Sequence, residues 1–205
     1  MQDLLIFPYN GNGIEALDCL GNEFNFIGFV DDTKEKQGTN SSGHKVFDRT
    51  AFEKYPDAKV LAVPGSPASF KIRKDIIDSL KLKAERFATV IHPNASISKN
   101  AAIGKNCLIY AGVVITANAR IGDHICILPN TVIHHDTKIG DYTLIGSNIC
   151  IAGYTVIGNN CYIGSGSNII NNINIGNGVL IGMGSNVIKN VSENSKIAGN
   201  PAKAL

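Results

Sequence analysis

The sequence predicts two parts with different folds. Residues 1–92 are expected to form a small α/β unit with a parallel sheet, and residues 93–205 an all-β parallel β-helix. The main observation is a six-residue unit repeated sixteen times without a break from Ala95 to Asn190. A second observation is that strand-like and helix-like segments alternate before the repeat, which is typical of a parallel α/β sheet.

The third residue of every repeat is isoleucine, except in the last repeat, where it is valine. These residues are Ile97, Ile103, Ile109, Ile115, Ile121, Ile127, Ile133, Ile139, Ile145, Ile151, Ile157, Ile163, Ile169, Ile175, Ile181 and Val187. The first residue is small or β-branched, so the first and third residues point inward and the second points outward, as in a strand. A repeat this short predicts a solenoid in which each coil buries its apolar face against its neighbours.

A longer period of eighteen residues lies within the six-residue repeat. The fourth residue is glycine in every third repeat: Gly104, Gly122, Gly140, Gly158, Gly176. In the other two sets of repeats, the fourth residue is either mixed or never glycine. Three inequivalent sides predict a triangular coil whose turns stack about 4.8 Å apart. We expect these glycines to bend the chain at a positive φ angle. Each buried isoleucine contributes roughly 1.5–3 kcal/mol to stability.

The first 92 residues alternate between apolar runs and segments with helical spacing. Strands are predicted at 4–7, 26–30, 59–63 and 87–91, and helices at 14–20, after Thr50, and from Ser66-Pro67 to about Leu82. This order predicts a small parallel sheet.

Ligands of such sheets bind beyond the carboxyl ends of the strands. The candidate binding residues lie on three loops there: Tyr9, Asn10, Gly11, Asn12, Gly13, Asp31, Asp32, Gly65, Ser66. The first and third loops lead into predicted helices, whose N-termini favour an anion such as a diphosphate. The full dinucleotide fingerprint is missing because Pro8 stands where the first glycine would be. Ordinary strand–helix turns are the alternative interpretation.

One segment of the repeat, His134-His135-Asp136, departs from the usual corner composition. His135 is expected to stack between Ala117 and Gly153, whose small size would leave open space around an imidazole. Asp136 would hold the ring in one tautomer, which suits a general base. The alternative is a solvated corner histidine. A metal site is disfavoured because His134 and His135 point apart and no Cys or His stacks with them.

Bulk properties exclude several classes of protein. A formal net charge of +2 argues against a nucleic-acid surface. There is no run of eighteen apolar residues, so no membrane span is expected, and the N-terminus lacks the pattern of a secretory signal. Five cysteines without a CxxC pair favour reduced thiols and a cytoplasmic protein.

Four features together resemble a known family. They are the two-part order, Asp31-Asp32 after the second strand, His135-Asp136 in a middle coil, and the ending Ala198-Gly-Asn-Pro-Ala-Lys203. Over essentially the whole chain, they resemble the hexapeptide-repeat nucleotide-sugar acetyltransferases, the group of the bacterial bacillosamine-pathway N-acetyltransferase and the sialic-acid O-acetyltransferases. The resemblance implies a Rossmann-like N-terminal sheet, a left-handed β-helix and a homotrimer with active sites between subunits. The left-handedness comes from the resemblance alone, because crossovers between parallel strands are ordinarily right-handed.

The resemblance also implies a reaction. Acetyl-CoA, as cosubstrate, would donate acetyl to the amino group of a nucleotide-linked amino-deoxy sugar, a UDP-4-amino-4,6-dideoxy sugar, for bacterial surface glycans such as O-antigen, without a metal. His135 matches the general base, Asp136 its orienting acid, and Gly153 the glycine whose N–H receives the thioester oxygen. The three N-terminal loops would hold the nucleotide. The expected acetyl-CoA contacts, partly placed by charge and position, are Ala152, Gly153, Ser165, Gly182 and Lys189.

Three residues depart from the pattern of this family. Asn12 replaces a histidine common in relatives, Leu144 a second histidine near the coenzyme, and Leu128 an asparagine near the sugar. The base is left intact, but the identity of the sugar stays open. Two alternatives also remain, namely a sugar O-acetyltransferase of the sialic-acid type and a non-catalytic sugar-nucleotide binding protein.

Overall fold

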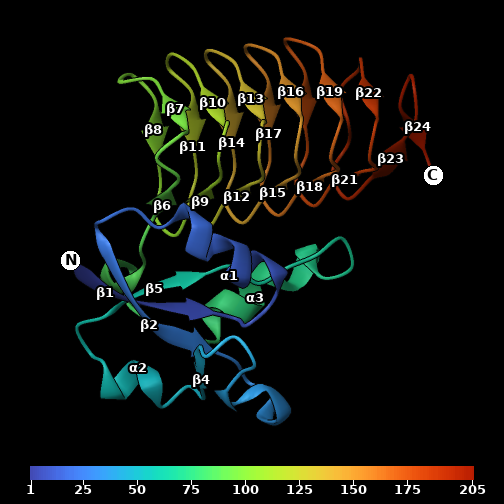
Figure 1. Ribbon diagram of the computed structural model, residues 1–205. Coiled ribbons are helices and arrows are strands. Elements are labelled where there is room, and N and C mark those ends of the chain that lie inside the picture. The colour runs from blue at the N-terminus through green and yellow to red at the C-terminus, as the bar shows by residue number, and fades with distance from the viewer.

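The computed structural model describes residues 1–205. An α/β domain at the N-terminus lies beside an elongated three-sided β-helix (Figure 1). The fold class predicted from the sequence, a small α/β sheet followed by a left-handed parallel β-helix, is confirmed. None of the helices is both long and apolar enough to cross a membrane.

The N-terminal sheet has the strand order β3-β4-β2-β1-β5. All neighbours are parallel except β3, an edge strand that pairs antiparallel with β4 and was not expected. Its elements are β1 Gln2–Phe7, α1 Gly11–Glu15, η1 Ala16–Cys19, β2 Phe24–Val30, η2 Lys34–Lys36, β3 Gly38–Thr39, β4 Lys45–Phe47, α2 Ala51–Lys54, β5 Lys59–Ala62, η3 Phe70–Ile72, α3 Arg73–Asp78 and η4 Ala84–Arg86.

Strand alternation divides the apolar side chains of β1 between two cores. Leu4 and Ile6 join the cluster that includes side chains of the β-helix, whereas Leu5 and Phe7 join the cluster that contains residues of α2 and α3. The central strand is therefore buried on both faces, as parallel strands usually are.

Two sequence predictions for this domain were wrong in detail. The helix predicted from Ser66 begins only at η3 and α3, because the Ser66 hydroxyl accepts from the Ala68 N–H and closes a local turn. The strand predicted at 87–91 is split. Phe87 bridges to Val60 of β5, whereas Val90–Ile91 forms β6 and pairs with β9 of the β-helix.

The sixteen repeats form sixteen two-residue strands, each at the second and third residues of its repeat. They are β7 Ser96–Ile97, β8 Ala102–Ile103, β9 Leu108–Ile109, β10 Val114–Ile115, β11 Arg120–Ile121, β12 Cys126–Ile127, β13 Val132–Ile133, β14 Lys138–Ile139, β15 Leu144–Ile145, β16 Cys150–Ile151, β17 Val156–Ile157, β18 Tyr162–Ile163, β19 Asn168–Ile169, β20 Asn174–Ile175, β21 Leu180–Ile181 and β22 Asn186–Val187. The predicted register is confirmed, with the isoleucines in one continuous core.

The strands stack into three sheets, one on each side of the prism, and all neighbours are parallel except the terminal pair β23 and β24. One sheet runs β22-β19-β16-β13-β10-β7 and a second runs β20-β17-β14-β11-β8. The third, here called the docking sheet, runs β24-β23-β21-β18-β15-β12-β9-β6 and includes β23 Lys196–Ala198 and β24 Lys203–Ala204. It lies next to the N-terminal domain, and the edge joining the other two sheets, here called the outer edge, lies on the far side (Figure 1).

The glycines of the repeat have a different role from the one predicted. Positive φ angles occur at the sixth residue of the repeat, most often asparagine or glycine, and not at the fourth-position glycines. A Cβ at Gly104 would lie 2.2 Å from Oδ1 of Asp123 and 2.6 Å from the Gly122 carbonyl. Glycine is therefore needed because successive coils stack closely, whereas asparagine tolerates the bend.

The docking sheet differs from the other two sheets in its outward side chains. At the second repeat position it carries only apolar residues or cysteine: Leu108, Cys126, Leu144, Tyr162, Leu180. These pack with the N-terminal core that contains Leu4, Ile6 and Phe70. Burial of this stripe holds the two domains together. The eighteen-residue spacing of the stripe is visible in the sequence.

Polar contacts complete the domain junction. Asn106 donates from Nδ2 to the Ala62 carbonyl at 2.8 Å and accepts from the Ala62 N–H at 2.7 Å. Arg73 is fully buried and donates to the carbonyls of Pro64 and His124. Burial lowers the pKa of Arg73 to about 10, so the guanidinium stays charged at neutral pH. It ties the loop after β5 to the β-helix.

The pH dependence of stability is predicted to involve His124 at this junction. Its ring stacks on Tyr142 with centroids 4.6 Å apart, and burial lowers its pKa. Below about pH 6.5 the unfolded chain therefore binds more protons at this histidine than the folded chain does. Stability should fall as the pH drops from there through the folded pKa. Thermal unfolding of the wild type and His124→Asn between about pH 7.5 and 5.5 tests this, because the variant should show a flatter Tm profile. Equal slopes would remove His124 as the cause.

Candidate active site

The outer edge carries the histidine singled out in the sequence. His135 lies in the connection between β13 and β14, on the far side of the β-helix from the N-terminal domain (Figure 1). Its side chain is 50% exposed, and Nδ1 is 2.9 Å from Oδ2 of Asp136. An ionised carboxylate can only accept, so Nδ1 carries the hydrogen and Nε2 presents a lone pair. The arrangement can take up a proton at Nε2.

The carboxylate of Asp136 is itself held in place. Its Oδ1 accepts from Nδ2 of Asn118, one coil away, at 3.2 Å. The hydrogen bond from His135, followed by that from Asn118, holds the pKa of Asp136 below its usual value. The carboxylate is therefore ionised at neutral pH and stabilises a proton on the imidazole.

Gly153 lies directly against the imidazole of His135. A Cβ at this position would be 2.7 Å from Cε1 and 2.8 Å from Nε2, so any side chain would displace the ring. The sequence analysis expected open space around His135, but on this face the space is filled by Gly153. The N–H of buried Gly153 donates to no acceptor in the protein. A free donor beside a base is the arrangement that offsets charge on a carbonyl oxygen.

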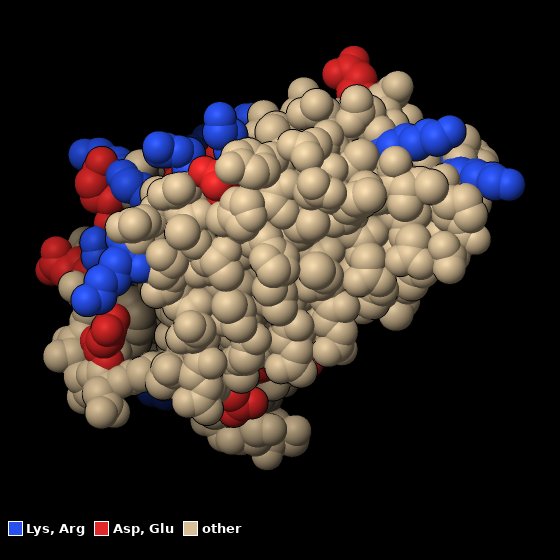
Figure 2. Space-filling view, turned by 90° about the horizontal axis from the view of Figure 1, so that it is seen from above, with Lys and Arg blue, Asp and Glu red and all other residues tan.

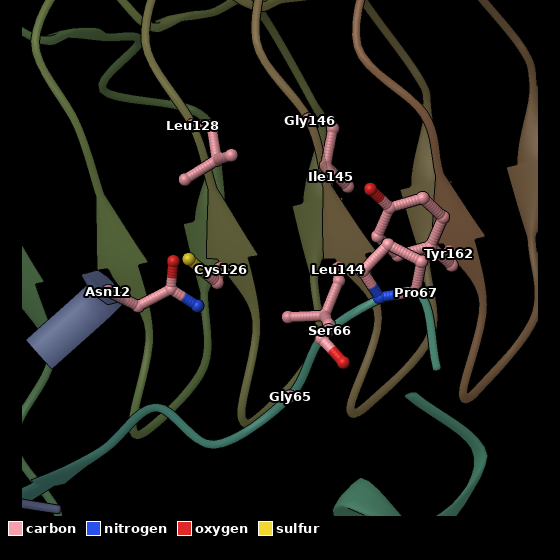
Figure 3. A pocket seen from close by; sticks show the side chains of 10 residues that line it. All are labelled: Asn12, Gly65, Ser66, Pro67, Cys126, Leu128, Leu144, Ile145, Gly146 and Tyr162. Carbon is pink, nitrogen blue, oxygen red and sulfur yellow. The ribbon is translucent and has the colours of Figure 1, made fainter. Parts of the chain in front are cut away.

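A cavity of about 250 Å³ lies between the N-terminal loops and the docking sheet. Its lining comes from both domains, with Asn12 and the Gly65–Pro67 segment facing the docking sheet (Figure 3): Asn12, Gly65, Ser66, Pro67, Cys126, Leu128, Leu144, Ile145, Gly146 and Tyr162. It brings together Asn12, Gly65 and Ser66 of the predicted nucleotide-binding residues. Its apolar wall was not anticipated, although the stripe on the docking sheet was the available signal.

Other predicted nucleotide-binding residues hold the loops in shape. Asn10 accepts from the Gly13 N–H at 2.8 Å and thereby caps α1, which is only one turn long. Gly11 is exposed and would have room for a Cβ. Neither residue lines the cavity.

Two neighbouring acidic residues are engaged within the N-terminal domain. Asp31 is 3% exposed and accepts from the Tyr9 N–H, the Thr33 N–H and Nζ of Lys36. Burial raises the pKa of Asp31, but hydrogen bonds from Thr33 and Lys36 outweigh this and keep it below its usual value. Asp32 forms a two-pronged ion pair with Arg49, at 2.7 and 2.8 Å.

The predicted acetyl-CoA contacts fall on two different edges of the prism. Ala152, Gly153 and Lys189 follow strands of the six-stranded sheet and lie on or near the outer edge, whereas Ser165 and Gly182 follow strands of the docking sheet. One chain therefore does not bring these five residues together. The cavity and His135 are likewise on opposite sides of the same prism. No group of His, Cys, Asp and Glu side chains is placed to hold a metal ion.

The repeat region matches family models of transferase repeats. Residues 118–153 match the bacterial transferase hexapeptide (six repeats), and residues 94–117 and 154–188 match the hexapeptide repeat of succinyl-transferase. The C-terminal domain is therefore a hexapeptide-repeat domain. No curated protein matches the chain.

Two solved structures share the fold over the whole chain, and a third shares it over part of the chain. The acetyltransferase domain of PglB from Neisseria gonorrhoeae, in complex with acetyl coenzyme A, is 24% identical with a TM-score of 0.85, and the match covers 100% of this chain and 99% of that one. PerB from Caulobacter crescentus, in complex with CoA and GDP-perosamine, is 22% identical with a TM-score of 0.84, covering 100% and 97%. A mutant of the N-acyltransferase AntD from Bacillus cereus, in complex with dTDP and coenzyme A, is 20% identical with a TM-score of 0.54, covering 57% and 79%.

Proposed function

We propose that this protein transfers acetyl from acetyl-CoA to the amino group of a nucleotide-linked amino-deoxy sugar used for bacterial surface glycans. The observation that carries the proposal is the pair of His135 and Asp136 set against the free N–H of Gly153. A base, its orienting acid and an oxyanion donor on one edge are the groups that amine acylation needs.

This geometry supports the following steps. The sugar amine attacks the thioester carbonyl while Nε2 of His135 accepts its proton, and Asp136 stabilises the imidazolium. The Gly153 N–H donates to the carbonyl oxygen as it becomes negative. When the tetrahedral intermediate collapses, the C–S bond breaks and the imidazolium returns the proton to the sulfur of coenzyme A. The products are an amide and free coenzyme A.

The nucleotide sugar is proposed to occupy the cavity beside the docking sheet. Gly65 and Ser66 offer polar backbone and hydroxyl groups, whereas Leu128, Leu144 and Tyr162 form an apolar wall suited to a deoxy sugar. PerB was solved with GDP-perosamine and AntD with dTDP, so proteins with this repeat fold differ in their nucleotide. We propose a UDP-linked 4-amino-4,6-dideoxy sugar. We also propose a cytoplasmic location, which five free cysteines support.

We further propose that the working enzyme is a homotrimer in which each active site lies between two copies. The support is geometric, because His135 and the cavity lie on opposite sides of one chain. The view onto the outer side of the β-helix shows Lys and Arg mostly toward its two ends and a largely uncharged middle (Figure 2). The six-stranded sheet there carries partly exposed Val114, Val132 and Cys150, which suit contact with another copy.

Direct assay tests the proposed function. The protein is incubated with acetyl-CoA and a panel of UDP-, dTDP- and GDP-linked 4-amino sugars, and release of free thiol is followed. We expect turnover with at least one amino sugar and a product that survives mild alkali, as an amide does. An alkali-labile product would indicate O-acetylation of a hydroxyl. Calorimetry showing no binding of acetyl-CoA would instead indicate a non-catalytic binding protein.

A further inference from the structure

The sixth repeat residue on the outer edge, here called the corner position, is an unexpected aromatic residue in one coil, Tyr154. The sixth residues of four successive coils there are Asn118, Asp136, Tyr154 and Asn172, and they share φ angles of 62°, 60°, 60° and 59°. Asparagine and aspartate enter this left-handed region readily, but a bulky tyrosine does so only at a cost in free energy. The two residues that are not asparagine are the two that flank His135.

Tyr154 contacts the imidazole directly. The two rings meet edge to face, with centroids 5.1 Å apart and an interplanar angle of 86°. The Tyr154 N–H also donates to the His135 carbonyl at 3.1 Å, which fixes the two residues side by side. With Asp136 at Nδ1 and Gly153 against the ring, the imidazole is contacted from three directions.

Packing elsewhere does not account for this tyrosine. Its side chain is 56% exposed, so it buries little apolar surface. The other tyrosine with the same backbone conformation, Tyr142, stacks on His124 and donates to Asp78 at the domain junction. Within one chain, Tyr154 has no such partner besides His135. Strained residues that stability does not explain are found mainly at functional sites.

We propose that Tyr154 is a positioning residue that holds the His135 imidazole in the orientation needed to accept the proton. The inference rests on the proposed acetyl transfer. The edge-to-face contact limits rotation of the ring, so that Nε2 points away from Asp136 and toward the space in front of Gly153. The strained backbone is retained because the contact serves the reaction.

The test is Tyr154→Asn, which restores the residue type of neighbouring coils. Removing the strain should raise Tm by roughly 2–4 °C. Freeing the imidazole should lower kcat roughly 10-fold, while KM for acetyl-CoA changes less than about twofold. A variant that is more stable but slower separates positioning from a structural role, because a structural residue would lose stability. Unchanged kcat would overturn the proposal while leaving the proposed function standing.

Two further variants sharpen the result. Tyr154→Phe should retain most of the activity, because the contact is made by the rings; a loss equal to that of Tyr154→Asn would overturn the proposal. Asn172→Gly changes the same corner position one coil further on and should leave kcat unaltered. NMR of ¹⁵N-histidine-labelled protein gives a readout independent of turnover. In relaxation measurements the His135 ring should show restricted motion in the wild type and greater motion in Tyr154→Asn, whereas identical relaxation would overturn the proposal even if no substrate is found.

Discussion

Replacing His135 with alanine is expected to lower kcat by roughly 10²–10⁴-fold, with a much smaller change in KM for either substrate. The imidazole is half exposed and lies outside the isoleucine core, so its loss removes the proton acceptor and leaves the coil intact. The measurement is steady-state thiol release from acetyl-CoA with the amino sugar selected in the panel assay. Equal Tm for the variant and the wild type would show that the change is chemical.

The neighbouring histidine supplies the matched control for this variant. His134→Ala removes a ring of the same kind from the same corner. Of the two histidines, only His135 forms a hydrogen bond with Asp136. We expect kcat within about threefold of the wild type. If His134→Ala is the slower variant, or if His135→Ala turns over at nearly the wild-type rate, the assignment of the base to His135 is wrong.

Much of the β-helix was predictable because its repeat is regular. An isoleucine every six residues fixes both the strand register and the inward face, and the departure at His134-His135-Asp136 directed attention to the outer edge. The cause of the glycine pattern was not predictable in the same way. Which residue takes the positive φ depends on how coils stack, and stacking distances are not visible in a single repeat.

The domain junction and the cavity were harder to predict. Arg73 has the sequence context of an exposed helix residue, and only the tertiary fold shows it buried against the carbonyls of Pro64 and His124. Asp31 was predicted to bind ligand, and the sequence did not show that its oxygens also accept hydrogen bonds from Tyr9, Thr33 and Lys36 of the same domain. Such roles depend on contacts between residues far apart in the chain.

Activity is expected to return when two inactive variants of the protein are mixed within the same trimers. His135→Ala lacks the base, and Ser66→Trp fills the cavity from an exposed loop position without disturbing the core. Each variant alone should be nearly inactive with the nucleotide sugar. Co-expressed with different affinity tags and purified as mixed trimers, they should regain about one third of the wild-type activity, because every mixed trimer holds one complete site out of three.

The recovery follows from counting sites in a trimer. If each site takes His135 from one copy and the cavity from the next, it works when the first copy carries only Ser66→Trp and the second only His135→Ala. A site built within one chain would never be complete in these mixtures, because every chain carries one of the two lesions. Acetyl-CoA binding by purified Ser66→Trp, measured by calorimetry, verifies that this variant still folds and assembles. Mixed trimers without activity would therefore rule out the shared site, and the proton would have to pass to His135 from a sugar bound elsewhere on the outer edge.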